Sequence, residues 1–179
     1  MNTELEQWLA DEEAVLQRQR AHAQPAFGAL GTAEQFAGMN GLQQLQEMLA
    51  GRVSVAPISR TLDFYLLEVR EGHAVFQGQP LFHHYNPMGG IHGGWYATLL
   101  DSALGCAVHS TMKLGERYTT VEIKLNLVRA MTEGSPERVR AIGRVRHRGR
   151  QMATAEADLV GPDGKLYAHA STSCLVIAP

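Results

Sequence analysis

The segment GGWYATLLDSALGCAVHS, from Gly93 to Ser110, limits the possible folds of this chain more than any other. Apolar residues occur on nearly every side of the helix that it would form. A helix that is apolar on all sides must be buried on all sides. Because one sheet can cover only one flank of a helix, we expect a second copy of the chain to cover the other flank, in a homodimer.

Stretches typical of β-strands precede and follow this helix. Residues 58–80 predict two strands, and residues 137–177 predict three more. In TTVEIKLNLVRA, residues 119–130, apolar and polar residues alternate strictly, which is typical of a half-buried strand with Val121 on its apolar face. The resulting order is β-β-α-β-β-β-β, an α+β chain with antiparallel pairing across its short connections. The predicted turns are at Glu71–His73, Arg148–Arg150 and Gly161–Gly164.

The N-terminal part of the chain has a different character. Residues 1–24 predict a helix, which PAFGALG at residues 25–31 would end. Thr32 is positioned to cap a second helix that Gly51 would end. We therefore divide the chain into a helical extension, residues 1–56, and a second domain, residues 57–179. We interpret the extension as a packing or oligomerisation element.

The composition excludes several classes of protein. The net charge of −2 gives no overall basic field that would attract nucleic acid. The sequence lacks a run of about 18 apolar residues, so we expect no membrane span. Its acidic start is unlike a signal peptide, which favours the cytoplasm. We expect Cys106 and Cys174 to be buried thiols, because cytosolic disulfides are rare.

One carboxylate, Asp101, interrupts the apolar helix. A buried charge is costly unless it is paired or hydrogen-bonded, so one interpretation is a hydrogen bond with Thr98 or Ser102, or a pair with an arginine. The other interpretation is functional. The first N–H groups of the helix, at Gly93 and Gly94, have no partner within it and can stabilise a developing oxyanion.

The distance along the helix limits the functional interpretation. Seven residues of helix rise by about 10 Å, which is too far for Asp101 to attack a carbonyl held at its own helix start. A two-fold dimer would remove this difficulty if Asp101 of one chain faced the helix start of the other.

The segment NPMGGIHGGWYATLLDSALGCAVHS resembles the Asn-Pro, His-Gly-Gly and Asp signature of hotdog-fold acyl-CoA thioesterases of the phenylacetate-degradation (PaaI-like) type. TTVEIKLNLVRA and GRVRHRGRQMATAEADLVGPDGKLYAHASTSCLV resemble the strands that follow in that family, so the resemblance covers about residues 58–177. It implies a long helix wrapped by an antiparallel sheet, a dimer that often pairs into a tetramer, and hydrolysis of acyl-CoA without any further cofactor.

The resemblance also implies roles for individual residues. Gly93 would donate its N–H to the thioester oxygen, and Asp101 would act as nucleophile or general base. Asn86 would position the water or the carbonyl, and His92 would organise the loop. A hydroxyl at the start of the next strand would assist; Thr120 matches best, but the adjacent Thr119 stays open.

Arginines recur at even positions from Arg138 to Arg150, where they would share one face of a strand. The next strand has Glu156 and Asp158 at even positions, so cross-strand ion pairs are one interpretation. The other is that Arg148 and Arg150, beside a turn, bind the phosphates of CoA, because guanidinium suits phosphate geometry.

Three histidines, His83, His84 and His92, lie close together, but without a helical histidine pair or a cysteine pair we expect no metal site. The remaining candidates for substrate binding are Phe82, His84, Gly94 and Trp95.

Two further functions compete with thioester hydrolysis. A hotdog hydratase or dehydratase would need a catalytic histidine together with a carboxylate. A non-catalytic acyl-CoA-binding protein would have no use for a costly buried carboxylate, which argues against it.

Overall fold

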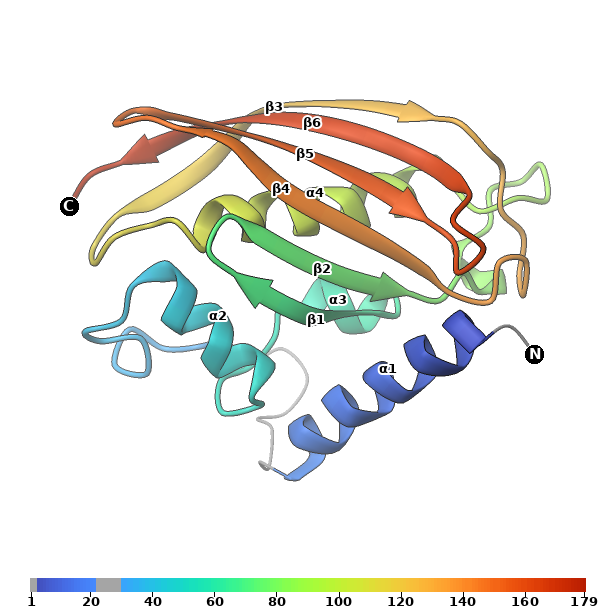
Figure 1. Ribbon diagram of the computed structural model, residues 1–179, viewed down its shortest axis with the longest axis horizontal. Coiled ribbons are helices and arrows are strands. Elements are labelled where there is room, and N and C mark those ends of the chain that lie inside the picture. Colours follow the sequence, from blue (N-terminus) through green and yellow to red (C-terminus); the bar gives the residue numbers. More distant parts are fainter. Residues whose placement is uncertain (1–2, 22–29) are drawn as a thin grey trace.

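The structure, a computed structural model, describes residues 3–21 and 30–179 of the chain. An antiparallel sheet curves around one long helix, α4 (Figure 1). The helices are α1 (Thr3–Ala21), α2 (Gly41–Leu49), α3 (Pro57–Thr61), the short 3₁₀ helix η1 (Phe82–His84) and α4 (Gly93–His109). The strands are β1 (Phe64–Arg70), β2 (His73–Gly78), β3 (Arg117–Leu127), β4 (Val139–Arg148), β5 (Met152–Val160) and β6 (Leu166–Ile177).

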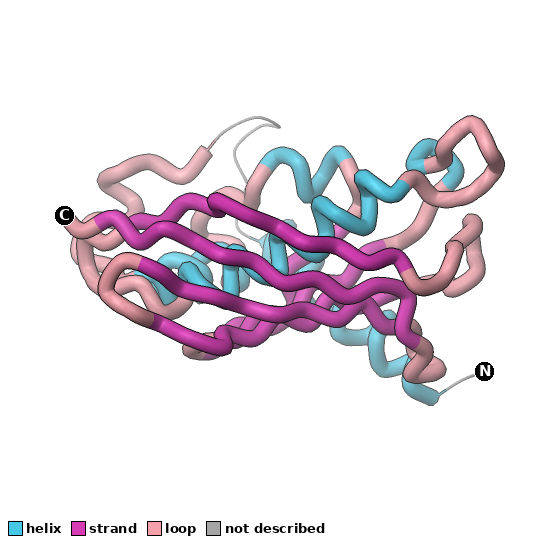
Figure 2. The backbone as a smooth tube through the Cα atoms, turned by 90° about the horizontal axis from the view of Figure 1, so that it is seen from above, coloured by secondary structure: helices cyan, strands magenta, loops and turns pink. Residues whose placement is uncertain are grey.

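The six strands form one sheet in the order β1-β2-β4-β5-β6-β3, and every pair is antiparallel. The order of elements and the three predicted turns are therefore confirmed. Figure 2 shows how strongly the strands twist over the helix. None of the helices in the described ranges is long and apolar enough to cross a bilayer.

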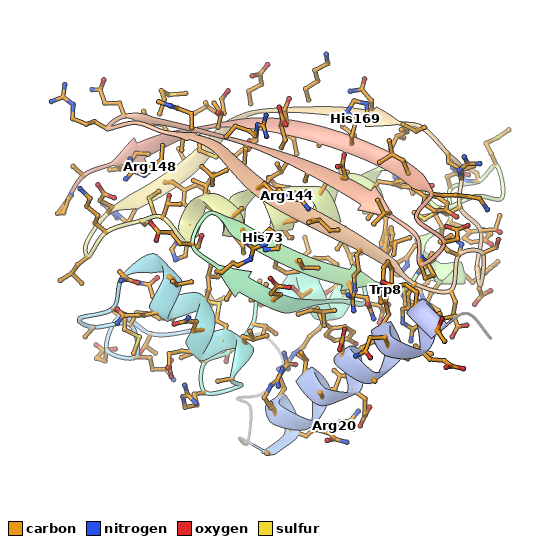
Figure 3. The ribbon with its side chains drawn as sticks, in the orientation of Figure 1. Trp8, Arg20, His73, Arg144, Arg148 and His169 are labelled. Carbon is orange, nitrogen blue, oxygen red and sulfur yellow. The ribbon has the colours of Figure 1, made fainter. Side chains whose placement is uncertain are left out.

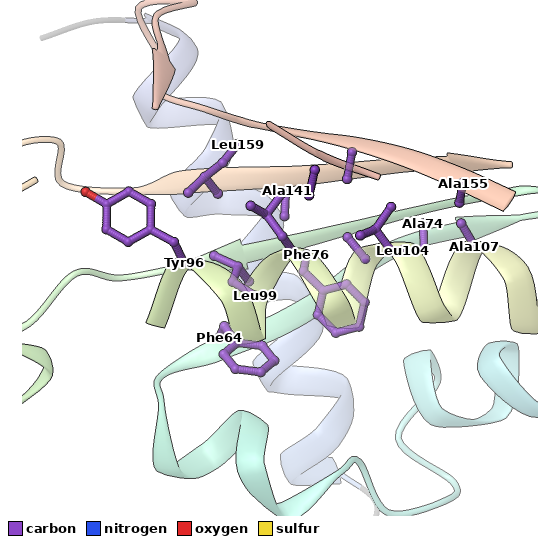
Figure 4. Close-up of a cluster of buried hydrophobic side chains, with 14 of the residues drawn as sticks. Phe64, Ala74, Phe76, Tyr96, Leu99, Leu104, Ala107, Ala141, Ala155 and Leu159 are labelled. Carbon is purple, nitrogen blue, oxygen red and sulfur yellow. The ribbon is translucent and has the colours of Figure 1, made fainter. Parts of the chain in front are cut away.

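Small residues on the inner face of the sheet let α4 lie very close to it. Ala141, Ala155 and Leu159 point toward the helix, opposite Leu99 and Leu104 (Figure 4). Gly143 of β4 shows how tight the contact is, because a Cβ at this position would lie 2.2 Å from the backbone oxygen of Ala103. The core of the molecule is this interface between α4 and the sheet.

Most of the apolar surface of α4 is covered by the chain itself. Trp95, Leu100 and Val108 are at most 3% exposed, although they lie on different sides of the helix. The side left uncovered carries the smaller and more polar residues, among them Thr98 and Asp101. Our expectation that apolar residues of α4 itself would need a second chain is therefore wrong, because the curved sheet, including β1, and helix α2 supply the missing cover.

The exposed apolar surface lies instead on β3, the edge strand. Val121 is 57% exposed, Ile123 39% and Leu127 53%. The prediction of a half-buried strand fails within a single chain, because β3 has a neighbour on one side only and nothing in the described chain covers these side chains.

The N-terminal helices pack directly on the sheet. α1 lies on its outer face, where the Arg140 guanidinium is 4.4 Å from the ring centre of Trp8 (Figure 3). Arg138 Nε donates to Glu12 Oε2 at 2.8 Å, and Arg140 Nη2 to Asp11 Oδ2 at 2.7 Å. The proposed division at residues 56 and 57 stays a prediction.

Two local predictions in this region are wrong. The residues after Thr32 form only turns, since Gly38 adopts φ +75°, and the second helix starts later, with Asn40 as the side chain that caps it. The residues from Pro57 to Thr61 form α3 and not the start of a strand, because proline at the first helical position favours a helix start. The predicted break at residues 25–31 lies largely outside the described residues.

Candidate active site

The start of α4 presents an unpaired backbone donor. His92 caps the helix, and its Nδ1 accepts the N–H of Gly94 at 2.8 Å. The N–H of Gly93 has no acceptor within residues 3–21 and 30–179. A Cβ at Gly93 would lie 3.1 Å from the side chain of Leu127, so glycine keeps this donor accessible beside β3. The helix start can therefore bind a carbonyl oxygen, with His92 as the organiser of the loop.

Asp101 lies two turns further along α4, on its uncovered side. Its carboxylate has no hydrogen-bond or ion-pair partner in the described part of the chain. The hydroxyls of Thr98 and Ser102 are unavailable as donors to it, since they donate to the backbone oxygens of Gly94 and Thr98, respectively. The structural interpretation of Asp101 as a locally hydrogen-bonded residue is therefore wrong.

The surroundings of Asp101 suit a general base. The residue is exposed to solvent in the single chain, not buried as we expected. Partial desolvation by the neighbouring apolar walls nevertheless raises the pKa of its carboxyl above the ordinary value. A carboxylate with a raised pKa accepts a proton more readily near neutral pH.

Asp101 lines a cavity of about 170 Å³ between α4, the start of the sheet and the N-terminal helices. Its lining residues are Gln19, Leu45, Met48, Val55, Ala56, Ser59, Phe64, Tyr65, Leu66, Phe76, Asp101, Ser102, Gly105, Cys106, Tyr118 and Thr120. Most of these side chains are apolar. The carboxylate thus stands at the wall of a pocket that suits an apolar group.

Thr120 lies in the same cavity because β3 contains a bulge. The register with β6 shifts between Thr120 and Glu122, so that Val121 is an additional residue. Without the bulge, strict alternation would place Thr120 on the face opposite Ile123, as the sequence pattern suggested. With it, the Thr120 hydroxyl lies 4.0 Å from the buried Cys174 Sγ and faces the cavity. Thr119 lies on the outer side of the strand, which favours Thr120 as the hydroxyl of the site.

Asn86 has a structural role in the loop before α4. Its Oδ1 accepts the N–H groups of Met88 and Gly90, at 2.9 and 3.4 Å. The side chain thus holds the turn that precedes the Gly93 donor, and it is absent from the lining of the Asp101 cavity. A direct contact with substrate stays a prediction.

Three residues that we expected to bind substrate lie elsewhere. Trp95 is a core residue, 3% exposed, whose Nε1 donates to the backbone oxygen of Leu62 at 2.8 Å. Phe82 is 70% exposed and packs against Tyr85, with ring centres 5.2 Å apart. His84 is buried and stacks on Trp95. None of the three lines the Asp101 cavity of the same chain, and their part in substrate binding stays a prediction.

His83 and His84 instead share the carboxylate of Asp63. Asp63 Oδ2 is 2.7 Å from Nε2 of His83 and 3.3 Å from Nε2 of His84. These three residues have the proximity of metal ligands. However, the Leu81 N–H donates to Nδ1 of His84 at 3.1 Å, so the proton of the neutral ring resides on Nε2. In this arrangement the Nε2–H of His84 lies near Asp63 without forming a hydrogen bond, and the ring offers no free lone pair to a metal.

The arginines of β4 do not all share one face. The register with β5 shifts between Val145 and His147, and this bulge turns Arg148 to the inner side of the sheet. Arg148 bonds to Glu116 and to the backbone oxygen of Gly149. Of the expected cross-strand pairs, Arg146 and Glu156 form one at 3.3 Å.

Arg150 lies beyond the strand end, without a partner among the described residues, in a surface cleft that Lys113 and Arg148 also line. It is therefore the more accessible of the two predicted phosphate ligands.

Both cysteines are free thiols, and neither forms a disulfide. Cys174 is fully buried, as expected, whereas Cys106 is only partly buried and lines the cavity. Burial raises the pKa of the Cys106 thiol to about 12, so this thiol is a poor nucleophile.

Comparisons with known proteins show similarity to one protein family and to several solved structures. Residues 88–168 match the model of the Thioesterase superfamily. A conserved protein from Pseudomonas aeruginosa is 27% identical, over 69% of this chain and 95% of its own, with a TM-score of 0.64. A mutant of the phenylacetic acid degradation protein PaaI from Thermus thermophilus is 26% identical. The match covers 67% of this chain and 98% of the PaaI chain, with a TM-score of 0.61.

A hypothetical thioesterase from Streptococcus pneumoniae, solved with coenzyme A, is 23% identical, over 65% of this chain and 87% of its own, with a TM-score of 0.58. A search of the curated proteins found no match. Residues 88–168 are thus similar to the thioesterase superfamily, and the chain has the hotdog fold seen in the solved PaaI-like thioesterases.

Proposed function

We propose that this protein hydrolyses acyl-CoA thioesters to a free acid and CoA. The observation that carries the proposal is the position of Asp101: an unpartnered carboxylate stands in the wall of an apolar cavity that Thr120 also lines, in a chain that matches the thioesterase superfamily over residues 88–168. A thioester is a reactive acyl donor, so one base and one oxyanion site are sufficient for its hydrolysis.

The site is completed by a second subunit. Gly93 and Asp101 lie on one helix, at a distance along its axis that prevents both from reaching the same carbonyl. The exposed apolar side chains of β3 supply the surface for a homodimer. In that dimer, Gly93 of one chain faces Asp101 of the partner subunit across the two-fold axis.

The reaction would begin at the helix start. The N–H of Gly93 donates to the thioester oxygen and stabilises the negative charge that develops on it. Asp101 takes a proton from water as the water oxygen forms a bond to the carbonyl carbon, and Thr120 holds the water or the carboxylate in place. The C–S bond then breaks, and the proton on Asp101 neutralises the departing thiolate.

Direct attack by Asp101 is the alternative for the same residue. The carboxylate oxygen would bond to the carbonyl carbon and expel CoA as a thiolate, and water would hydrolyse the resulting anhydride. Single-turnover hydrolysis in ¹⁸O-labelled water tests for this route. If water attacks the aspartyl carbonyl of the anhydride, the product acid keeps an unlabelled oxygen from the enzyme and ¹⁸O enters Asp101, an outcome that the general-base route does not give.

The nucleotide end of the substrate would lie on the protein surface. The related Streptococcus pneumoniae protein was solved with coenzyme A, which supports CoA as the leaving group here. Arg150 and Lys113 line one surface cleft and would bind phosphate groups.

Hydration of an enoyl-CoA is the competing enzymatic function. It would need a histidine that acts as a base beside the carboxylate. His92, next to Gly93, already accepts the N–H of Gly94 through Nδ1, and no histidine is among the described residues that line the Asp101 cavity. Hydrolysis is therefore the better proposal.

Release of free thiol from a panel of acyl-CoA and enoyl-CoA thioesters tests the proposal. We expect thiol release from saturated acyl-CoAs and no loss of the enoyl absorbance without it. If no thioester releases thiol and none is hydrated, while CoA esters bind, the protein is a binding protein and the proposed function is wrong.

A further inference from the structure

The N-terminal helices form a large part of the wall around the Asp101 cavity. Leu45 and Met48 come from α2, Val55 and Ala56 lie in the segment leading to α3, and Ser59 is on α3. All five precede residues 88–168, the part of the chain that matches the superfamily model. The reacting carboxylate and the wall opposite it thus come from different parts of the chain.

This wall is fixed in place by specific contacts with the far end of α4. The N–H of Gly41, at the start of α2, donates to the backbone oxygen of Met112 at 2.9 Å. His109 Nε2 lies 2.9 Å from Gln44 Oε1, and Asn40 closes a capping box at the helix start. Because α2 is tied to α4 at several points, the cavity has a defined depth before any substrate enters.

The volume of the cavity limits the acyl group that it can hold. A dry cavity of about 150 Å³ binds benzene, and the cavity beside Asp101 measures about 170 Å³. Phe64, at 0% exposed, and Leu45, at 3%, close its inner side. There is room for a six-membered ring or for a chain of similar length, and none for a long fatty acyl chain within the wall as it stands.

We propose that α2 and the segment leading into α3 determine acyl specificity, and that they restrict the enzyme to apolar acyl groups of about six to eight carbons, in a chain or a ring. This inference rests on the proposed thioester hydrolysis. It gives the N-terminal extension a role in the reaction beyond packing or oligomerisation.

Met48 and Leu49 provide a matched pair for the test. They are neighbours on α2 and both are partly buried against the core, but only Met48 lines the cavity. The experiment measures kcat/KM for straight-chain acyl-CoAs from four to fourteen carbons with wild type, Met48→Ala and Leu49→Ala.

In the wild type, kcat/KM should rise about fourfold with each methylene that the cavity buries and then fall beyond the optimum. Met48→Ala should move the optimum to a longer chain by about two carbons, while Leu49→Ala should leave it in place. Val55→Phe, which puts a larger side chain into the lining of the cavity, should move the optimum to a shorter chain.

The outcomes separate this inference from the proposed function. Hydrolysis with a flat chain-length profile, or with an optimum that none of the variants moves, overturns the inference and leaves thioester hydrolysis intact. A wild-type protein that releases thiol from no acyl-CoA, whether the acyl group is a straight chain or carries a six-membered ring, overturns the proposed function itself. Thermal melting of each variant confirms that a shift in optimum is measured on folded protein.

Discussion

Strands β2 and β3 lie at opposite ends of the sheet order and have opposite surroundings. Every residue of β2 is buried, because α4 covers one face of the strand and α1 covers the other (Figures 1 and 3). β3 is an edge strand on which most residues are exposed, including Val121, Ile123 and Leu127. Both strands carry apolar side chains on the face toward α4.

The difference shows which part of the fold this chain completes alone. The β2 end has its own cover, made from residues far away in the sequence. The β3 end has no such cover within the described chain, and exposed apolar edge strands are sites where proteins associate with one another. In the proposed dimer, a second copy of the chain would cover this end of the sheet and would also complete the proposed active site.

Asp101 lies on the uncovered side and gives the largest expected effect. Asp101→Asn keeps the shape of the side chain but removes the base, so we expect kcat to fall about 10²- to 10⁴-fold. Because the pKa of the Asp101 carboxyl is raised by desolvation, the charged form is the less stable one in the folded protein. The variant should therefore melt at the same temperature as wild type or slightly above it. Near wild-type turnover would contradict the carboxylate mechanism.

The same pKa shift predicts the pH dependence. A raised pKa means that Asp101 becomes protonated at a higher pH than an ordinary aspartate. The kcat/KM of the wild type should therefore fall on the acidic side, starting at a less acidic pH than for an unperturbed carboxyl. An activity that is independent of pH across this range would exclude Asp101 as the base.

At the covered end of the sheet, around β2, the contact between α1 and β4 can be disrupted to test how much it stabilises the fold. Arg138 and Glu12 form a pair in which the side chains are only 10% and 12% exposed. Arg138→Ala leaves Glu12 without its cation and should cost about 3 kcal/mol of stability, a fall in Tm of about 6–12 °C. Arg20→Ala is the control, because its pair with Glu13 is largely exposed and should contribute little. Equal melting of both variants would show that α1 contributes little to stability.

At the uncovered end of the sheet, dimer formation through β3 can be tested by introducing a negative charge on each face of the strand. Ile123→Glu places a carboxylate on the exposed apolar face and should raise the dissociation constant of the dimer about a hundredfold, with loss of activity at the same protein concentrations. Lys124→Glu, on the opposite face of the strand, should leave the dimer intact. Light scattering over a dilution series checks both. A wild type that is monomeric at micromolar concentration would contradict the proposed dimer.

The smallest effect is expected at the surface cleft. Arg150→Ala should raise the KM for acyl-CoA about three- to tenfold, because Arg150 is free to bind phosphate. Arg148→Ala should change the KM less, since Arg148 is occupied by Glu116. A short thioester without the nucleotide serves as control and should show no change with either variant. An unchanged KM for acyl-CoA with Arg150→Ala would exclude its role in binding.

The elements with a strong local signal could be predicted from the sequence. Apolar periodicity identified α4 and the strands, and Gly161–Gly164 identified a turn. The start of α2 could not be predicted as well, because Thr32 and Asn40 are both good caps and only the positive φ of Gly38 decides between them. The β-bulges at Val121 and near Arg146 could not be predicted from the sequence either, since they arise from pairing between strands.

The candidate site likewise contains residues whose positions the local sequence predicts and residues whose positions depend on tertiary contacts. Asp101, Gly93 and His92 stand on the helix or at its cap, where local geometry is nearly fixed by sequence. Trp95 is on the same helix but points into the core, and no local signal distinguishes a core tryptophan from a pocket tryptophan. Met48 and its neighbours on the cavity wall were missed, because a contact between α2 and α4 depends on the path of the chain between them.

The position of α1 also restricts how two sheets could stack. α1 occupies the outer face of β2 and β4, so a back-to-back assembly of dimers would have to meet through the outer faces of β5, β6 and β3. That surface is polar and carries Lys124, Glu156, Asp158 and His169. Contacts between exposed charges weaken as ionic strength rises. A tetramer built in this way would separate into dimers in concentrated salt, while the apolar contact along β3 would persist.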